Sequence, residues 1–219
     1  MIPDTIHVGY VHPGTVHERF MRSLLKAFKL SERLIAFSGS TCPRQHVARN
    51  DNIRDFLKGP CEWFLQIDTD MEFDMHAPDR LVDAAVEAGA KVAGALCFGY
   101  NKDQAEVFVG IWMWNEEKKE YERQDDYSEG ERFYVDATGA AFLLVHRDIL
   151  EAIDYPWHQD HVFHPDTGQA MGHDISFCHK IRTVTGESVL YCADIPIGHV
   201  KEFTVTEETY QAYRKATQC

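Results

Sequence analysis

Strand-like and helix-like apolar patterns alternate through the first hundred residues, and this alternation limits the folds open to the chain. Short apolar runs predict strands at residues 5–11, 34–38, 63–67 and 91–96. Helical spacing predicts a helix with Val16, Phe20, Leu24 and Phe28 on its inward face, and further helices at residues 43–57 and 79–88. Such an order predicts a parallel sheet covered by helices on both faces, with ligands beyond the carboxyl ends of its strands.

The pattern changes after residue 100. Antiparallel strands are predicted at residues 107–114, 121–123 and 133–135, around the charged stretch 115–132. Buried strands follow at residues 140–146 and 188–193, and helices at residues 147–153, 173–185 and after a capping residue, Thr206. Because no repeat, low-complexity tract or linker interrupts the sequence, we expect one domain over residues 1–219.

Charge and composition exclude several classes of protein. The 35 Asp and Glu residues outnumber the 22 Lys and Arg residues, and the net charge of −13 disfavours non-specific binding to nucleic acid. The longest apolar run, residues 140–145, is far shorter than the roughly 20 residues of a membrane span. Without a secretory signal pattern, we expect a cytoplasmic protein whose six cysteines, none in a C-x-x-C pair, are mostly buried free thiols.

The sharpest local motif is Asp68-Thr69-Asp70, directly after the predicted strand at residues 63–67. At the carboxyl end of a parallel strand, the two carboxylates face the ligand crevice. Oxygen ligands of this kind suit Mg²⁺ or Mn²⁺, which keep open positions for substrate phosphates. A polar loop without a metal is the alternative. A calcium loop is disfavoured because Phe73 stands where an EF-hand needs glycine.

Two later positions also carry chemistry. Asp174 lies at the start of a predicted helix, where it is either a general base or a residue that stabilises the helix dipole. His199 follows Gly198 after the last predicted strand, and it is either a metal ligand or a structural histidine. A zinc site at residues 157–164 with His173 is disfavoured because the run lacks the usual ligand spacing.

Six segments, in order along nearly the whole chain, resemble motifs of metal-dependent nucleotide-sugar glycosyltransferases of the GT-A fold, particularly short phage-type and bacterial members. They are a nucleotide-binding strand and loop (residues 9–15), a stretch ending in Ala48-Arg49-Asn50 (40–50), the D-x-D motif (68–70), an acceptor-side D-A-T-G segment (136–144), an E-D-type motif (172–178) and a late G-H pair (198–199). The chain departs from the family at His173, where Glu is usual.

The resemblance implies an α/β fold: a GT-A-like, Rossmann-like and mostly parallel central sheet flanked by helices, with a small antiparallel acceptor-side sheet. Residues 1–100 would bind the nucleotide-sugar, and residues 101–219 would form the acceptor side. The metal, Mn²⁺ or Mg²⁺, would be held by Asp68, Asp70 and His199, with Asp68 reaching the donor ribose or the metal through water. Asp174 would be the catalytic base. The residues implied in donor binding are Val11, His12, Pro13, Arg44, Arg49, Asp68, Thr69 and Gly139.

The implied reaction moves a sugar, taken as UDP-linked, to an acceptor hydroxyl on a modified DNA base or a glycan, with inversion of the anomeric carbon. For Arg44 and Arg49, a solvated helix charge is an equal alternative, and for Gly139 a plain turn. A metal-dependent nucleotidyltransferase is the other enzyme class considered, although the sequence lacks the Gly-rich loop G-G-x-G-T-R after the first strand. A non-catalytic module that binds nucleotide or sugar is the remaining alternative.

Overall fold

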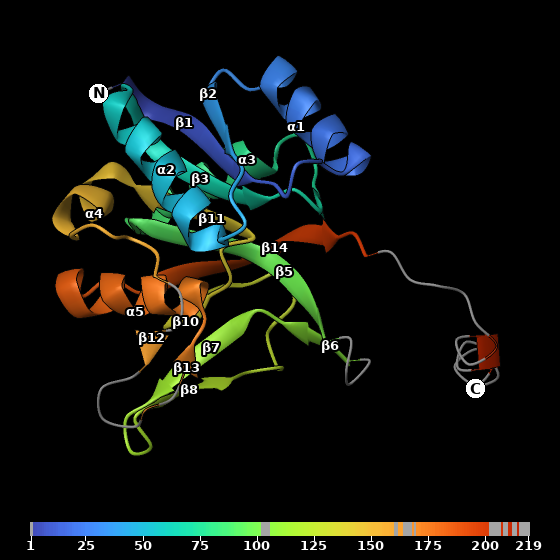
Figure 1. Cartoon of the computed structure of the whole chain (residues 1–219), viewed down its shortest axis with the longest axis vertical. Coiled ribbons are helices and arrows are strands. Elements are labelled where there is room, and N and C mark those ends of the chain that lie inside the picture. Colours follow the sequence, from blue (N-terminus) through green and yellow to red (C-terminus); the bar gives the residue numbers. More distant parts are fainter. Residues whose placement is uncertain are drawn as a thin grey trace.

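The computed structural model of the chain describes residues 2–101, 106–159, 162, 163, 168, 170–201, 207, 210, 211 and 214. Within these residues the chain forms a nine-stranded sheet in the order β2-β1-β3-β11-β5-β14-β4, with β6 beside β5 and β9 beside β14 (Figure 1). Its strands are β1 (Ile2–Val11), β2 (Leu34–Ser40), β3 (Cys61–Asp68), β4 (Met71–Glu72), β5 (Val92–Asn101), β6 (Glu106–Val109), β9 (Arg132–Val135), β11 (Phe142–His146) and β14 (Val189–His199). The predicted cap of a terminal helix, Thr206, lies outside the described residues.

Helices cover both faces of this sheet, as the alternating sequence pattern predicts. On one face, α1 (Glu18–Leu30) and α3 (Ala77–Ala88) pack on alternate residues of the sheet, including Trp63, Leu65 and Ile67 of β3. On the other, α2 (Gln45–Lys58), α4 (Arg147–Ala152) and α5 (His173–Thr185) pack on the intervening side chains, such as Phe64. Figure 1 shows the two helical layers on either side of the central strands. Burial on both faces explains why β3 reads as a continuous apolar run.

The central sheet is mixed, and the expectation of a mostly parallel sheet is wrong in this respect. β1 runs parallel to β2 and β3, and β14 runs parallel to β5, but β11 lies antiparallel between β3 and β5. After β5 the chain makes short strands at the carboxyl edge of the sheet instead of crossing back by a helix. β11 starts at that edge, with Phe142 opposite Ile67 near the end of β3, so it runs in the opposite direction.

The smaller strands form two further sheets. One is a three-stranded sheet in the order β10-β7-β8, which confirms the expected antiparallel addition. Its strands are β7 (Ile111–Asn115), β8 (Glu120–Arg123) and β10 (Ala137–Thr138), and a separate pair is formed by β12 (Val162–Phe163) and β13 (Ala170–Met171). The single strand expected at residues 107–114 is instead divided at Gly110 into β6 and β7, because Gly110 donates its N–H to the Cys97 carbonyl.

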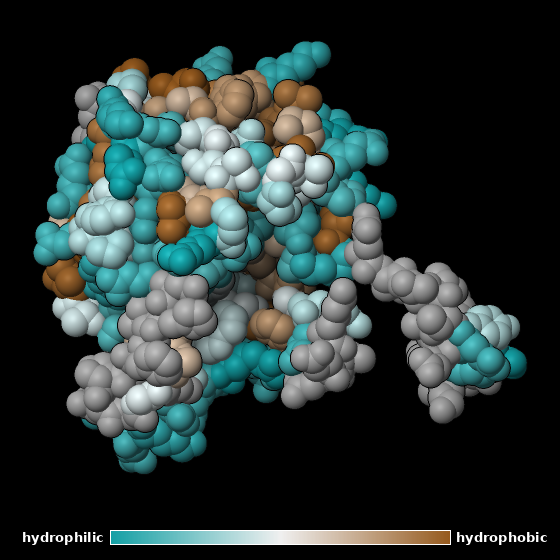
Figure 2. Space-filling model, viewed as in Figure 1, coloured by the Kyte–Doolittle hydropathy of each residue, from teal (hydrophilic) through white to brown (hydrophobic). Residues whose placement is uncertain are grey.

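Surface and thiol properties match the composition. Hydrophilic side chains cover most of the face drawn in Figure 2, with apolar side chains scattered among them. None of the described helices has the length and apolar character needed to cross a bilayer. Cys42, Cys61, Cys97, Cys178 and Cys192 are free, and all but Cys42 are buried, which confirms the expected state of these five thiols.

Candidate functional site

A cleft of about 1110 Å³ lies at the carboxyl ends of β1, β2 and β3. This is the edge where the strand and helix order predicts a ligand. The wall contains the sequence-predicted residues Val11, His12, Pro13, Arg44, Asp68, Thr69, Asp70 and His199, together with Gln45, His173 and Lys201. Of the other predicted site residues, Arg49 is buried behind the wall, and Gly139 lies next to Asp174.

The Asp68-Thr69-Asp70 turn is held from both sides by segments distant in sequence. The Thr69 hydroxyl donates to the Val11 carbonyl at 3.2 Å, and the backbone N–H of His17 donates to the Thr69 carbonyl at 3.1 Å. On the other side, the N–H of Val200 donates to the Asp70 carbonyl at 2.8 Å. The turn is therefore fixed in place by the loop after β1 and by the end of β14.

Asp70 and His199 lie in direct contact at the edge of the cleft. His199 Nε2 is 2.9 Å from Asp70 Oδ2, and Lys201 Nζ is 2.8 Å from the same oxygen. Burial alone would raise the pKa of Asp70, but the contacts with His199 and Lys201 outweigh burial and lower it to about 2. Asp70 is therefore a carboxylate at neutral pH and carries the charge that a cation ligand needs.

The donor atoms of this pair fit a divalent ion. His199 Nδ1 lies 2.6 Å from the Phe98 carbonyl, and because a carbonyl only accepts, the ring hydrogen sits on Nδ1 and leaves Nε2 for a cation. Neighbouring ligands of a six-coordinate ion at about 2.1 Å are about 3 Å apart, which matches the 2.9 Å between Nε2 and Oδ2. Asp70 and His199 are therefore suited to share one Mn²⁺ or Mg²⁺ once the Lys201 ammonium group leaves Asp70 Oδ2.

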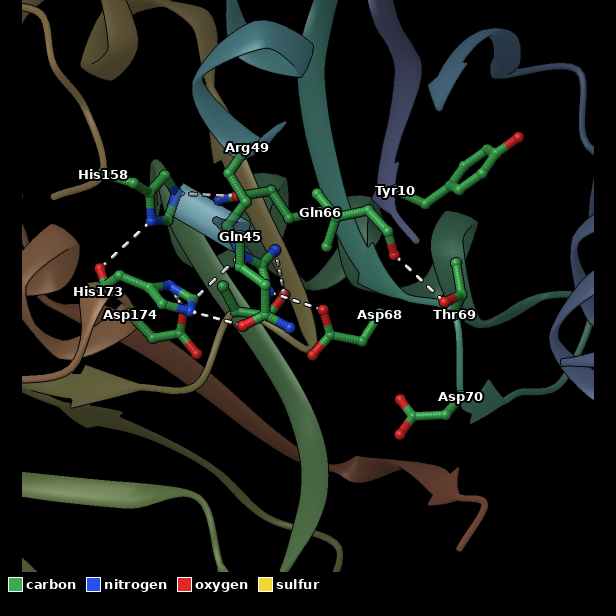
Figure 3. Close-up of polar contacts among 12 residues, drawn as sticks. Tyr10, Gln45, Arg49, Gln66, Asp68, Thr69, Asp70, His158, His173 and Asp174 are labelled. Carbon is green, nitrogen blue, oxygen red and sulfur yellow. Dashed lines mark hydrogen bonds and ion pairs between the residues drawn. The ribbon is translucent and has the colours of Figure 1, made fainter. Parts of the chain in front are cut away.

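Asp68 faces a different partner. Its Oδ1 accepts from Nη2 of Arg49 at 2.7 Å, and Arg49 also donates from Nη1 to the Ala140 carbonyl at 3.2 Å. Arg49 Nε is 3.8 Å from Asp174 Oδ1, so one guanidinium lies between two carboxylates (Figure 3). Arg49 is only 2% exposed, which excludes a solvated helix charge. Arg44, in contrast, is exposed at the start of α2.

The pKa values of the two carboxylates beside Arg49 are shifted in opposite directions. Burial raises the pKa of Asp68, and the nearby Asp174 and Asp70 charges reinforce this effect against the opposing Arg49. Burial would also raise the pKa of Asp174, but Arg49 and the contact with His173 lower that pKa far below the ordinary range. Asp174 is thus firmly ionised.

α2 carries three buried polar side chains, Arg49, Asn50 and Asn52, within about one turn, which explains the Ala48-Arg49-Asn50 motif. Asn50 exchanges two hydrogen bonds with the backbone of His158, through Nδ2 at 2.8 Å and Oδ1 at 2.9 Å. Asn52 donates to the Tyr10 carbonyl at 2.9 Å and accepts from the Ser40 hydroxyl at 2.7 Å. These bonds fix α2 against the strands that carry the cleft.

A histidine pair lies behind the cleft at the start of α5. His158 is fully buried, stacked on Phe177 with ring centroids 4.1 Å apart, and its Nε2 is 2.9 Å from Gln66 Oε1. His173 lies at the cleft wall, with Nδ1 in contact with Asp174 Oδ1 and Nε2 3.1 Å from Gln45 Oε1 (Figure 3). Gln45 and His173 therefore line the wall, and Asp174 contacts His173 without lining the cleft itself.

His158, His173 and Asp174 are the group of metal-ligating side chains that converges within the described residues, with ligand atoms within 4.8 Å of one another. Both ring nitrogens of His158 are already engaged, by Gln66 and by the His173 carbonyl at 3.3 Å. The buried Arg49 guanidinium also lies beside Asp174, and it would repel a second cation. These contacts disfavour an ion here. In the run at residues 157–164, where the sequence disfavours a zinc site, His161 and His164 lie outside the described residues.

The acceptor-side segment at residues 136–144 has mixed roles. Asp136 accepts from the Trp114 N–H at 2.8 Å and pairs with Arg182, so it stabilises the small sheet. A Cβ atom added to Gly139 would lie 3.9 Å from Asp174 Oδ2. The backbone of Gly139 therefore passes close to that carboxylate, and a Cβ there would make an ordinary van der Waals contact with it.

Several residues of the site are not predicted from the sequence. Lys201 lies two positions after His199 on an extended segment, a spacing that places both side chains on one side of the chain. Gln66 is a polar residue within an otherwise apolar strand, which is itself a signal of a buried partner. Gln45 and His158 give no local signal, because their contacts with His173 and Gln66 join residues far apart in sequence.

Comparison with known proteins identifies the fold. No family model matches the chain, and no curated protein sequence matches it significantly. Among solved structures, A197 from STIV aligns with a TM-score of 0.65 and 16% identity, over 90% of this chain and 86% of that one. GalNAc-T7, solved with UDP, GalNAc and Mn²⁺, aligns with a TM-score of 0.54 and 13% identity, over 91% of this chain and 44% of that one. The chain has a GT-A-like fold.

Proposed function

We propose that the chain is a metal-dependent glycosyltransferase that moves a sugar from a UDP-sugar to an acceptor hydroxyl. The observation that carries this proposal is the contact between Asp70 and His199 at the mouth of a large cleft beyond the carboxyl ends of the parallel strands. The fold is shared with GalNAc-T7, whose structure contains UDP, GalNAc and Mn²⁺. A site of the same chemistry in this chain would bind the same class of donor.

Different residues around the cleft would contact different parts of the donor. Val11, His12 and Pro13 would line the nucleotide site, with Thr69 at its floor. Asp68 would accept hydrogen bonds from the donor ribose, held in place by Arg49. Arg44, exposed at the start of α2, would lie near the diphosphate, and Gly139, next to Asp174, would lie near the sugar.

Asp70 and His199 would hold Mn²⁺ or Mg²⁺, and the bound ion would stabilise the negative charge that develops on the diphosphate as the sugar leaves. Lys201 would add a further positive charge close to the same group. Beside His173 of the cleft wall, Asp174 and its neighbours at the start of α5 would serve the acceptor hydroxyl. Water is then the competing acceptor, so slow hydrolysis of the donor is expected in the absence of the true acceptor.

Calorimetry of UDP binding with Mn²⁺ and with EDTA tests this proposal. We expect binding with Mn²⁺ to weaken at least tenfold in EDTA, and the variants Asp70→Asn and His199→Gln to bind as weakly with Mn²⁺ as the parent chain does in EDTA. Asp55→Asn, an exposed acid paired with Lys58, is the matched control and should bind normally. Equal affinity with and without metal would refute the proposed donor site.

Turnover separates an enzyme from a binding module. A panel of UDP-sugars is first screened by thermal shift with and without Mn²⁺, and the sugars that stabilise the chain are then incubated with it. Release of UDP from one of them supports a transferase. Metal-dependent binding with no release of UDP from any sugar would favour the non-catalytic binding module.

A further inference from the structure

The start of α5 places an imidazole between the cleft and the carboxylate that sequence reasoning assigns as the base. α5 begins at His173, after Gly172 in an extended conformation, so His173 and Asp174 are its first two residues. His173 lines the cleft, whereas Asp174 is not among the residues that line it. The His173 side chain retains 17% exposure, enough for its ring edge to meet a ligand.

The two ring nitrogens of His173 have different neighbours. Nδ1 lies in ion-pair contact with Asp174 Oδ1, although the two atoms do not have hydrogen-bond geometry, and because the carboxylate repels a bare lone pair, this contact favours the ring hydrogen on Nδ1. Nε2 lies 3.1 Å from Oε1 of Gln45, an exposed residue of the cleft wall, and the oxygen and nitrogen of that amide can exchange places by a half-turn of the side chain. An amide can turn its NH₂ group toward a bare nitrogen, or yield its place to an acceptor hydroxyl. Nε2 is therefore the nitrogen that is free to accept a proton from the cleft.

Asp174 is poorly suited to take the proton itself. Its Oδ1 faces both His173 Nδ1 and Arg49 Nε, the latter at 3.8 Å. Both neighbours favour the ionised carboxylate and hold its pKa far below the ordinary range, against the effect of burial. A general base works best when its proton affinity matches the operating pH, and histidine is the residue most often used near neutrality.

Other groups around His173 set its environment. Arg49 and Gln45 approach from α2, Asp68 lies at the end of β3, and the neutral His158 ring packs 5.9 Å away, centroid to centroid. The pKa of His158 is lowered well below its usual value, mainly by burial and next by Arg49, so His158 does not compete for the proton.

We propose that His173 Nε2 is the proton acceptor of the reaction and that Asp174 is a positioning residue that fixes the ring. This rests on the proposed glycosyltransferase function. The acceptor oxygen forms a bond to the anomeric carbon while the bond from that carbon to the phosphate oxygen breaks, and the electron pair leaves with UDP. The hydroxyl proton moves to Nε2, and the resulting imidazolium keeps its Nδ1–H against Asp174. The assignment explains why the chain carries histidine where the family that the sequence resembles usually has glutamate.

Hydrolysis of the UDP-sugar identified by the panel distinguishes the two possible bases. With His173 as base, His173→Gln should lower kcat about 10²- to 10⁴-fold while the affinity for UDP with Mg²⁺ is unchanged. His173→Glu should restore part of the rate, with the pH profile shifted to lower pH because a carboxyl group titrates at lower pH than an imidazole. His76→Gln, at an exposed histidine before α3, is the matched control. Retention of kcat within about tenfold in His173→Gln would overturn the assignment.

A spectroscopic measurement tests the same arrangement without turnover. In ¹⁵N NMR spectra of the metal-free chain at alkaline pH, His173 should carry its hydrogen on Nδ1. Asp174→Asn should raise the fraction with the hydrogen on Nε2, while leaving the UDP affinity with Mg²⁺ intact. A ring with its hydrogen on Nε2 in the parent chain overturns the proposal. If the parent chain shows no metal-dependent binding of UDP, the proposed glycosyltransferase function is contradicted. If it binds UDP with metal but carries the ring hydrogen of His173 on Nε2, only the assignment of the base is contradicted.

Discussion

A single buried arginine organises the acidic residues of the site. Arg49 comes from a helix, yet its guanidinium lies among Asp68, Asp174 and the Ala140 carbonyl, which belong to three other segments. The bulk of the molecule is acidic, so two carboxylates this close to each other need a fixed positive charge between them. Arg49 supplies that charge and joins the donor side of the cleft to the start of α5.

Replacement of Arg49 by Met should destabilise the chain strongly. Removal of one partner from a buried ion-pair network leaves uncompensated charge and costs about 3–5 kcal/mol. Because Asp68 and Asp174 are about one quarter exposed, we expect the lower end of this range, measured as the free energy of unfolding in urea. Arg54→Met, which removes an exposed pair with Asp51, should cost less than about 1 kcal/mol. Equal effects of the two substitutions would contradict the organising role of Arg49.

The stereochemical outcome also follows at this scale. With one proton-accepting pair at the start of α5, and with Asp68 and Asp70 occupied by Arg49 and His199, an acceptor oxygen displaces UDP directly. Direct displacement inverts the anomeric carbon, so a UDP-α-sugar should release a β-sugar on hydrolysis. Proton NMR of the first anomeric signal to appear measures this. An α-sugar as first product would contradict inversion and the proton-accepting role of the pair.

At the scale of elements, close contact between α2 and β1 aligns the cleft. A Cβ atom at Gly9 would lie 2.4 Å from the Phe64 ring and 3.1 Å from Asn52 Cβ. Without a side chain at Gly9, Asn52 can reach the Tyr10 carbonyl, and the helix lies flat against β1. The position of Arg49 therefore depends on a glycine in the neighbouring strand.

Gly9→Ala should lower the free energy of unfolding by about 1–3 kcal/mol, the usual cost of overpacking a tight core. Gly59→Ala, at the end of α2, is the control, since a Cβ there would meet only the Phe56 carbonyl, at 3.4 Å. Urea unfolding measures both. UDP binding should weaken along with stability in Gly9→Ala, because α2 carries Arg49. A Gly9→Ala chain as stable as Gly59→Ala would show that α2 is not held tightly against β1.

The elements also show which features the sequence can predict. Periodicity locates β1, β3, α2 and α5 well because it records which side chains are buried. Periodicity does not show which strands pair with one another. It therefore predicts neither that β11 pairs antiparallel with β3 nor that β14 extends to His199.

The site shows the same difference: the sequence locates the segments that carry the residues but not the contacts between those segments. Asp70 and His199 are predicted in part because each follows a strand that the pattern locates, and they meet in the structure. His173 stands out only as a departure from the family that the sequence resembles, and its contacts with Gln45 and Asp174 follow from the docking of α5 beside α2. Docking of this kind is a property of the tertiary structure that no single segment encodes.

At the scale of the whole molecule, positive and titratable side chains gather in the cleft of an acidic protein. Among the residues that the structure describes, the cleft is lined by Arg44, Lys201 and the histidines His12, His17, His46, His173 and His199. The net charge of −13 would repel a diphosphate at long range, so a local positive lining is needed to admit one. Asp68 and Asp70 also line the cleft and offset Arg44 and Lys201, so a bound cation would be needed to make the lining positive.

Acid should destabilise the whole fold through a histidine remote from the cleft. Burial lowers the pKa of His7 to about 4, with the charge of Arg147 acting in the same direction against Asp55. The unfolded chain binds this proton near pH 6.5 but the folded chain does not, so stability falls as the pH drops from about 6.5 to 4. The loss attributable to His7 is about 3 kcal/mol.

Urea unfolding at pH 7 and pH 4.5 measures this dependence. His7→Gln, which can still bond to the Ser38 hydroxyl, should lose less stability between the two pH values than the parent chain does. His76→Gln, at an exposed histidine, should follow the parent. An unchanged pH dependence in His7→Gln would contradict this source of acid sensitivity.

The pairing of Asp70 with His199 joins residues that are 129 positions apart. During synthesis from the N-terminus, β1, β2 and β3 emerge first and can pair with one another. β14, which carries His199, leaves the ribosome much later and must insert beside β5. A nascent chain would therefore pair β1, β2 and β3 well before it could hold a metal ion between Asp70 and His199. The proposed metal site would be complete only after β14 has inserted beside β5.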